Sequence, residues 1–174
     1  MEVIVPADSP VRTLTDLKGK TIAFTSPTSN SGFKAPSVLL KSEFGLEVDK
    51  DYKAVFSGKH DTSVLGVANK DYDAVTVANE VKKRMIARGT VDGAKIRMIY
   101  ESAVFPTTGY GHVYNLHPML AARVKQAFFT FPWEGSELQN EFKSSSKFAA
   151  ITYKTDWETI RKIDAASGVT YECK

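Results

Sequence analysis

Cysteine is almost absent from the sequence: Cys173 is the only one, so no disulfide can form within the chain. The three histidines, His60, His112 and His117, are not spaced like the ligands of a metal site. No stretch approaches the ~20 apolar residues of a membrane-spanning helix. The sequence therefore indicates neither a metal centre nor a membrane span, and we expect no cofactor.

An excess of one charge is also lacking. The net charge is +3, with lysine and arginine interleaved with aspartate and glutamate. The densest basic run is Lys82-Lys83-Arg84, which we interpret as a solvated helix face rather than a nucleic-acid site. We expect no nucleic-acid partner.

Motifs for catalysis are missing as well. No Gly-x-Ser-x-Gly turn supplies a nucleophile, and no glycine-rich loop ends in Gly-Lys-Ser/Thr. Ser31, His60 and Asp61 offer the residue types of a hydrolase, but nothing in their spacing sets them in mutual reach. We expect a protein that is not an enzyme.

What the sequence does contain is a regular alternation of short apolar runs and helical patterns. Strands are predicted at 2–5, 20–25, 52–56, 72–77, 96–100 and, as an edge or hinge strand, 110–114. Helices follow several of them. One runs to Phe44, and because of Pro36 either its first turn is distorted or it starts near Ala35. Three more are predicted at 117–131, 134–142 and 155–166. The pattern indicates an α/β fold with a mostly parallel sheet flanked by helices, plus C-terminal helices.

The run Ser26-Pro27-Thr28-Ser29-Asn30-Ser31-Gly32-Phe33 joins a predicted strand to a predicted helix. One interpretation is an N-cap cluster that only begins the helix. The other is an oxyanion site, because helix-start N–H groups are unpaired, the helix dipole favours negative charge, and glycine lets a ligand approach the backbone. This run alone leaves both open.

Polar residues recur at the same position after other strands. They are Ser57-Gly58-Lys59-His60-Asp61 after 52–56, Asn79-Glu80 after 72–77, and Glu101-Ser102 with Thr107-Thr108 after 96–100. Parallel strands present their carboxyl ends at one edge, where α/β proteins bind ligands. His60 would donate a hydrogen bond to an anion, and Glu80 would accept a proton that the ligand retains.

These segments resemble the periplasmic substrate-binding proteins of phosphonate, phosphite and phosphate ABC transporters. The resemblance runs from about Val3 to beyond Phe131 and is carried by residues 8–24, 29–36, 57–61, 67–75 and 102–106. It implies a lobe of a type II periplasmic-binding-protein fold, in which two α/β lobes close on the ligand. The implied ligand-binding residues are Ser29, Asn30, Ser31, His60, Glu80 and Thr108.

Two departures from the family pattern bear on the ligand. Asn30 replaces the family's threonine but keeps a donor, and Thr108 stands where members that bind aminoalkyl phosphonates have an aspartate. A small ligand such as phosphite, hypophosphite, phosphate or methylphosphonate fits this pattern better than one with an ammonium group.

The resemblance also implies that most of the first lobe would precede Met1. We expect a connector and partial hinge strand at 1–19, the second lobe with its anion-binding helix starts at 20–110, and at 111–174 a hinge return with helices that pack toward the first lobe. On this view Met1–Val5 and the helix at 155–166 have lost their partners, which exposes apolar surface and a sheet edge.

The function implied is the solute-binding component of an ABC importer, binding a small phosphorus oxyanion without chemistry. Its partners would be that ligand, a membrane permease and the missing first lobe, and its location periplasmic or lipid-anchored outside the inner membrane. Alternatives are a binding protein for another small solute such as a sulfonate or a thiamine precursor, a sensor domain of the same fold in a signalling protein, and a phosphoesterase-like enzyme.

Overall fold

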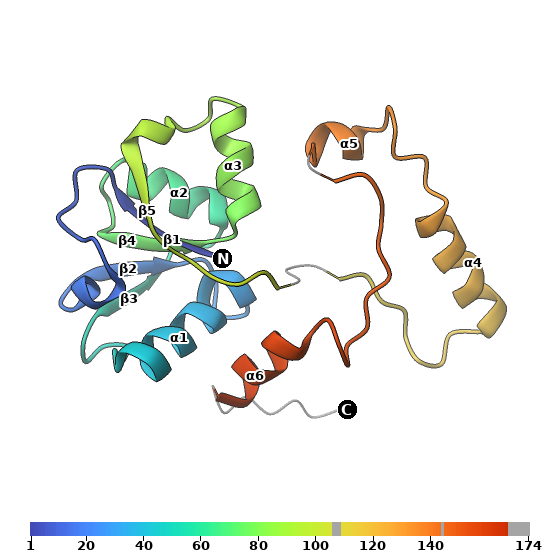
Figure 1. The fold of residues 1–174 in the computed structure, drawn as a ribbon, viewed down its shortest axis with the longest axis horizontal. Helices are drawn as coiled ribbons and strands as arrows, with labels where there is room; N and C mark the ends of the chain where they lie inside the picture. The colour runs from blue at the N-terminus through green and yellow to red at the C-terminus, as the bar shows by residue number, and fades with distance from the viewer. Residues whose placement is uncertain (106–108, 144, 167–174) are drawn as a thin grey trace. The chain divides into compact units, whose positions relative to one another are not determined.

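The computed structural model of the chain describes residues 1–105, 109–143 and 145–166 (Figure 1). The chain forms two units, one from residues 1–107 and 157–174 and the other from residues 108–156. The first unit is therefore discontinuous in sequence, and each unit is described by itself below.

A five-stranded sheet forms the centre of the first unit, in the order β3-β2-β4-β1-β5. Its strands are β1 (Glu2–Pro6), β2 (Thr21–Phe24), β3 (Lys53–Phe56), β4 (Ala74–Val77) and β5 (Ile96–Glu101). β2 pairs in parallel with β3 and β4, whereas β1 is antiparallel to both β4 and β5. The predicted α/β fold is confirmed, with β1 alone running against the other strands.

β1 corrects one expectation from the sequence. All five of its residues are buried, and it pairs on both sides, Glu2 with Val77 of β4 and with Glu101 of β5. Its backbone groups are thus satisfied by two neighbours, and the expectation that Met1–Val5 would leave an exposed edge is wrong.

Helices cover both faces of the sheet. α1 (Ala35–Phe44) and the 3₁₀ turn η1 (Leu14–Leu17) share one apolar core with Val3 and Val5 of β1. α2 (His60–Ala68) and α3 (Asn79–Ala87) share a second core with Ile4 of the same strand. Because side chains alternate along a strand, β1 serves both cores.

The helix predicted to begin near Ala35 does so. A single π-type turn, η2 (Asn30–Lys34), precedes it, and Pro36 lies in the first turn of α1, where its missing N–H removes no helical hydrogen bond. Gly45 ends α1 with φ 64°, as a left-handed C-cap. A short 3₁₀ turn, η3 (Gly93–Lys95), leads into β5.

The C-terminal helix α6 (Glu158–Ala166) also has partners. Ile160 is 4% exposed and belongs to a third apolar cluster with Met1, Ala35 and Phe105. The expectation that this helix would be left without partners is therefore wrong: it packs on α1 and η2 of the first unit.

The second unit contains α4 (Pro118–Phe129) and α5 (Glu137–Glu141), neither of which has a buried residue. The strand predicted at 110–114 is absent from the described part of this unit. Tyr110 instead stacks on Phe128, with ring centroids 5.5 Å apart, in an aromatic cluster completed by Phe131, Trp133 and Phe148. Among the described helices of the chain, none has both the length and the apolar character to cross a membrane.

Candidate anion-binding site

Three helical starts meet at one edge of the sheet. η2 follows β2, α2 follows β3 and α3 follows β4, and these three strands are parallel neighbours. Their carboxyl ends therefore lie together, and the N–H groups of the first turns collect at this edge.

Ser29 caps the η2 turn. Its hydroxyl oxygen accepts a hydrogen bond from the Gly32 N–H at 3.0 Å, and its carbonyl accepts from the N–H groups of Phe33 and Lys34 at 3.1 and 3.0 Å. The capping interpretation is thus correct for Ser29. It does not consume the turn's donors, because the N–H groups of Asn30 and Ser31 have no acceptor among the described residues. A cap and an oxyanion site are compatible here.

The position of this turn is set by its glycine. The Gly32 carbonyl accepts from the Thr25 N–H at 3.1 Å and from the Thr76 hydroxyl at 2.7 Å. A Cβ at this position would lie 1.9 Å from Thr25 Oγ1, so a larger residue would force Thr25 or the turn to shift. Thr25 and Thr76 were not predicted as site residues, because a threonine at a strand end carries no signal of its role in sequence.

His60 links the second and third helical starts. It is half-buried in the first turn of α2, and its Nδ1 accepts a hydrogen bond from the Ala78 N–H at 3.1 Å. Since Nδ1 accepts, the neutral ring carries its proton on Nε2. Burial lowers the pKa of His60, while the negative charges of Glu80 and Asp61 act in the opposite direction. At pH values above the ordinary pKa of histidine, His60 is therefore neutral and can donate a hydrogen bond through Nε2–H.

Glu80 lies in the first turn of α3 and is half-buried. Its negative charge raises the pKa of His60 and that of the Met1 amino group, which burial lowers. The Glu80 carboxylate therefore interacts electrostatically with the His60 ring at the same edge of the sheet. Thr108, the last predicted ligand-binding residue, lies outside the described residues.

An ion pair missed from the sequence anchors α3. Lys82 pairs with Glu2 of β1, and their side chains are 14% and 2% exposed. The interpretation of Lys82-Lys83-Arg84 as a wholly solvated face is therefore wrong at Lys82, although Lys83 is exposed. Buried charges require such partners, so this pair fixes the helix that carries Glu80.

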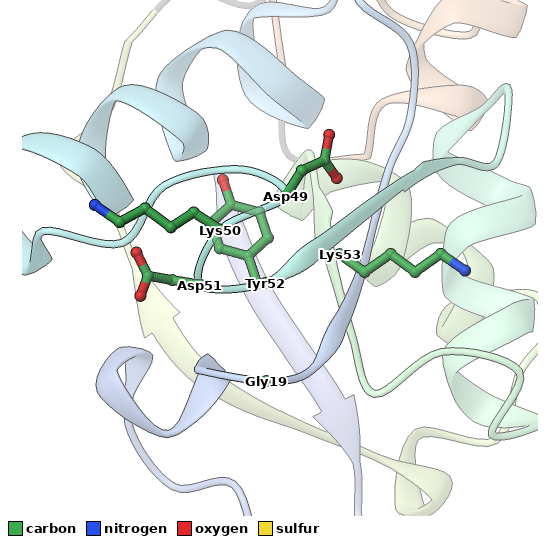
Figure 2. Close-up of a pocket in the computed structure, with 6 residues that line it drawn as sticks. All are labelled: Gly19, Asp49, Lys50, Asp51, Tyr52 and Lys53. Carbon is green, nitrogen blue, oxygen red and sulfur yellow. The ribbon is translucent and has the colours of Figure 1, made fainter.

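Two cavities lie at the opposite edge of the sheet. One, of about 270 Å³, lies where β3 begins and is lined by Gly19, Asp49, Lys50, Asp51, Tyr52 and Lys53 (Figure 2). The Lys50 and Lys53 side chains point away from each other, so they do not form a cationic site. A second, of about 480 Å³, includes the exposed Lys70–Asp8 ion pair. Neither cavity contains a predicted site residue.

Among the described residues, no group of three or more His, Cys, Asp or Glu side chains is placed so that it could hold a metal ion. The donors at the carboxyl edge suit a small oxyanion instead, because they are N–H and O–H groups at helix starts.

Comparison with known proteins decides the family. The family model described as "ABC transporter, phosphonate, periplasmic substrate-binding protein" matches residues 1–157. The chain belongs to this family. Among relatives within it, the Phosphate-import protein PhnD of Mycolicibacterium smegmatis is 26% identical over 168 residues, which cover 92% of this chain. The Phosphonates-binding periplasmic protein of Escherichia coli is 30% identical over 108 residues, or 60% of this chain.

The chain spans only part of these substrate-binding proteins: 52% of the mycobacterial protein and 32% of the Escherichia coli protein. Solved structures show the same fold. PhnD1 from Prochlorococcus marinus, in complex with methylphosphonate, matches with a TM-score of 0.77 at 16% identity, covering 96% of this chain and 66% of that one. A phosphonate-transporter binding protein from Pseudomonas aeruginosa gives 0.67 at 19% identity, covering 96% and 65%. The fold is that of the type II periplasmic binding proteins.

Proposed function

We propose that the chain binds a small phosphorus oxyanion at the carboxyl edge of β2, β3 and β4, without chemistry. The observation that carries this proposal is the meeting of three helical starts at that edge. The N–H groups of Asn30 and Ser31 have no acceptor among the residues that the structure describes, and His60 adds a neutral imidazole donor. The hydroxyls of Ser29 and Ser31 and the Asn30 amide add further donors.

Glu80 favours a phosphorus ligand over a sulfonate. A carboxylate beside an anion is favourable only if the ligand retains a proton that the carboxylate can accept. Phosphate carries such a P–OH group as a monoanion and as a dianion, and the monoanions of phosphite and of phosphonates carry one, whereas a sulfonate does not. The relatives named for phosphate import and for phosphonate binding agree with this choice.

The proposed role is that of the solute-binding component of an ABC importer, outside the inner membrane as a periplasmic or lipid-anchored protein. It would deliver the anion to a membrane permease. Because the chain spans about half the length of its mycobacterial relative, the rest of the ligand's shell would come from a first lobe. The division into 1–19, 20–110 and 111–174 stays a prediction within this proposal.

The test is calorimetric titration of the chain with phosphite, methylphosphonate, phosphate and methanesulfonate at pH 7. We expect at least one phosphorus anion to bind. At 100 times its Kd, this ligand should raise the free energy of unfolding by about 2.7 kcal/mol and so raise the melting temperature. Methanesulfonate should not bind.

Two variants make this test specific. His60→Ala should weaken binding by roughly tenfold, the loss of one hydrogen bond to a charged group, and Glu80→Gln should reduce the discrimination against methanesulfonate. His112→Ala, an exposed histidine of the second unit, is the matched control. The proposal is wrong if no phosphorus anion binds at millimolar concentration, or if His60→Ala and His112→Ala bind alike.

A further inference from the structure

The helix α6 returns to the first unit after the chain has formed the second. Residues 108–156 separate it in sequence from the rest of the first unit. It nevertheless packs on α1 and on the η2 turn, with Ile160 buried among Met1, Ala35 and Phe105. A distant segment of the chain thus lies directly against the candidate anion-binding turn.

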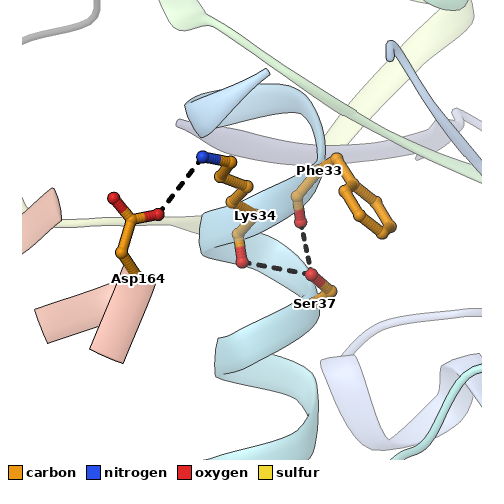
Figure 3. Close-up of polar contacts among 4 residues, drawn as sticks. All are labelled: Phe33, Lys34, Ser37 and Asp164. Carbon is orange, nitrogen blue, oxygen red and sulfur yellow. Dashed lines mark hydrogen bonds and ion pairs between the residues drawn. The ribbon is translucent and has the colours of Figure 1, made fainter. Parts of the chain in front are cut away.

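An ion pair joins the two segments. Lys34 Nζ lies 3.2 Å from Asp164 Oδ1, and the side chains are 17% and 13% exposed (Figure 3). Lys34 is the last residue of η2, and Asp164 lies in the second half of α6. Because water is largely excluded, the attraction is less screened than in a surface pair.

The same end of the turn is held by α1. The Ser37 hydroxyl donates to the carbonyl of Phe33 at 2.6 Å and is 3.1 Å from that of Lys34 (Figure 3). The Lys34 N–H in turn donates to the Ser29 carbonyl at 3.0 Å. A displacement of Lys34 is therefore transmitted through one hydrogen bond to Ser29, at the start of the donor-bearing residues.

We propose that Asp164 is a positioning residue for the anion-binding turn, holding the Ser29–Lys34 backbone in place through Lys34. The binding consequence rests on the proposed function, whereas the effect on the turn does not. Asp164 also lowers the positive potential around Lys34. Loss of Asp164 would therefore strengthen anion binding through the electrostatic effect and weaken it through displacement of the turn. The sign of the change in affinity shows which effect is larger.

The experiment compares Asp164→Asn and Lys34→Gln with the parent chain by hydrogen exchange and by titration with methylphosphonate. Amide exchange at Gly32, Phe33 and Lys34 should become about tenfold faster in both variants, as expected for partial loss of a half-buried pair. The sheet amides of β2 and β4 should be unchanged. Affinity for methylphosphonate should fall in parallel, about tenfold.

The matched control is Glu158→Gln, which breaks the exposed Glu158–Lys162 pair on the same helix. It should change neither exchange at the turn nor affinity, since exposed pairs contribute little. Asp164→Glu, which keeps the charge, should restore much of the protection. If Asp164→Asn fails to fold, Lys34→Gln breaks the same pair from the other side and decides the question.

The outcomes separate the two proposals. If the parent chain binds no phosphorus anion, the proposed function fails, while faster exchange at the turn in Asp164→Asn still supports the positioning role. Unchanged exchange at Gly32, Phe33 and Lys34 in both variants overturns that role. Tighter methylphosphonate binding by Asp164→Asn overturns it too, because Asp164 would then weaken anion binding through its negative charge.

Discussion

At the scale of single residues, His60 has two tasks that share one ring. Its Nδ1 accepts from the Ala78 N–H and so holds the start of α3 against the start of α2. Under the proposed function, its Nε2–H would donate to the bound anion. The first task requires the neutral ring, because a protonated imidazole has no acceptor, whereas Nε2–H can donate from either form.

This requirement gives a prediction about pH. Burial lowers the pKa of His60 below its ordinary value of 6.5 in the folded chain. As the pH falls through 6.5, the unfolded chain takes up the proton before the folded chain does, so the free energy of unfolding decreases down to the folded-state pKa. His60→Gln keeps an acceptor without a titrating ring, and it should show a flatter dependence in this window.

Urea unfolding at a series of pH values between 7.5 and 5 measures the difference. The Met1 amino group also has a lowered pKa, but it is common to both proteins and cancels in the comparison. Equal slopes for the parent and His60→Gln below pH 6.5 would contradict the assignment of His60 as a buried neutral histidine.

At the scale of elements, the η2 turn is specified by contacts that lie outside it. Its glycine is enclosed by Thr25 and bonded to Thr25 and Thr76, which belong to the end of β2 and to β4. Its end is held by Ser37 and Asp164. The backbone of this turn is therefore a product of packing among four elements rather than of its own residues.

Gly32→Ala tests this view. The added methyl group would lie 1.9 Å from Thr25 Oγ1 and 2.8 Å from Thr25 Cβ, so Thr25 or the turn must shift. We expect a loss of about 1–3 kcal/mol in the free energy of unfolding, the usual cost of overpacking. Denaturant unfolding measures it. Gly111→Ala, where a Cβ meets nothing within 4 Å, is the control and should be near neutral.

The sequence predicted the elements of the first unit well because each is marked locally. Gly45 ends α1, Pro36 fixes where it begins, and apolar runs mark the strands. The order of the strands was not predicted, since pairing of β1 between β4 and β5 depends on contacts far along the chain. The strand expected at 110–114 is absent from the described residues, and Tyr110 instead contributes its ring to an aromatic cluster.

The candidate site shows the same division. Ser29, Asn30, Ser31, His60 and Glu80 were predicted from their place after strands, and the structure places them at the helical starts of one sheet edge, while their role in binding stays a prediction. The residues that hold the turn in place were not predicted. Thr25, Thr76 and Asp164 act through positions that only folding brings near the turn, and no local pattern distinguishes them.

At the scale of the whole molecule, the first unit is closed by the return of α6. Phe105, before the second unit, and Trp157, after it, belong to the same apolar cluster. The two points where the chain leaves and re-enters the first unit are thus near each other, and a short connection suffices to join them.

We therefore expect that replacing residues 106–156 by a short Gly/Ser linker leaves the first unit folded. Circular dichroism and hydrogen exchange should show retained helix and protected amides in β1 and β4. A second variant that ends at Phe105 and so lacks α6 should lose protection at η2 and α1. Loss of sheet protection in the linker variant would contradict independent folding of the first unit.

The antiparallel strand β1 also has a consequence for how quickly this fold forms. Ile4 pairs with Val75 and Glu2 with Glu101, whereas the parallel strands β2, β3 and β4 follow one another through single helices. Non-local pairings slow folding because loop entropy is lost before contacts repay it. During synthesis, β1 must wait for β4 and then β5 before it can pair. Until the sheet forms around it, the side chains of Val3, Ile4 and Val5 lack the neighbours that bury them in the folded unit, and such transiently exposed apolar strands favour aggregation.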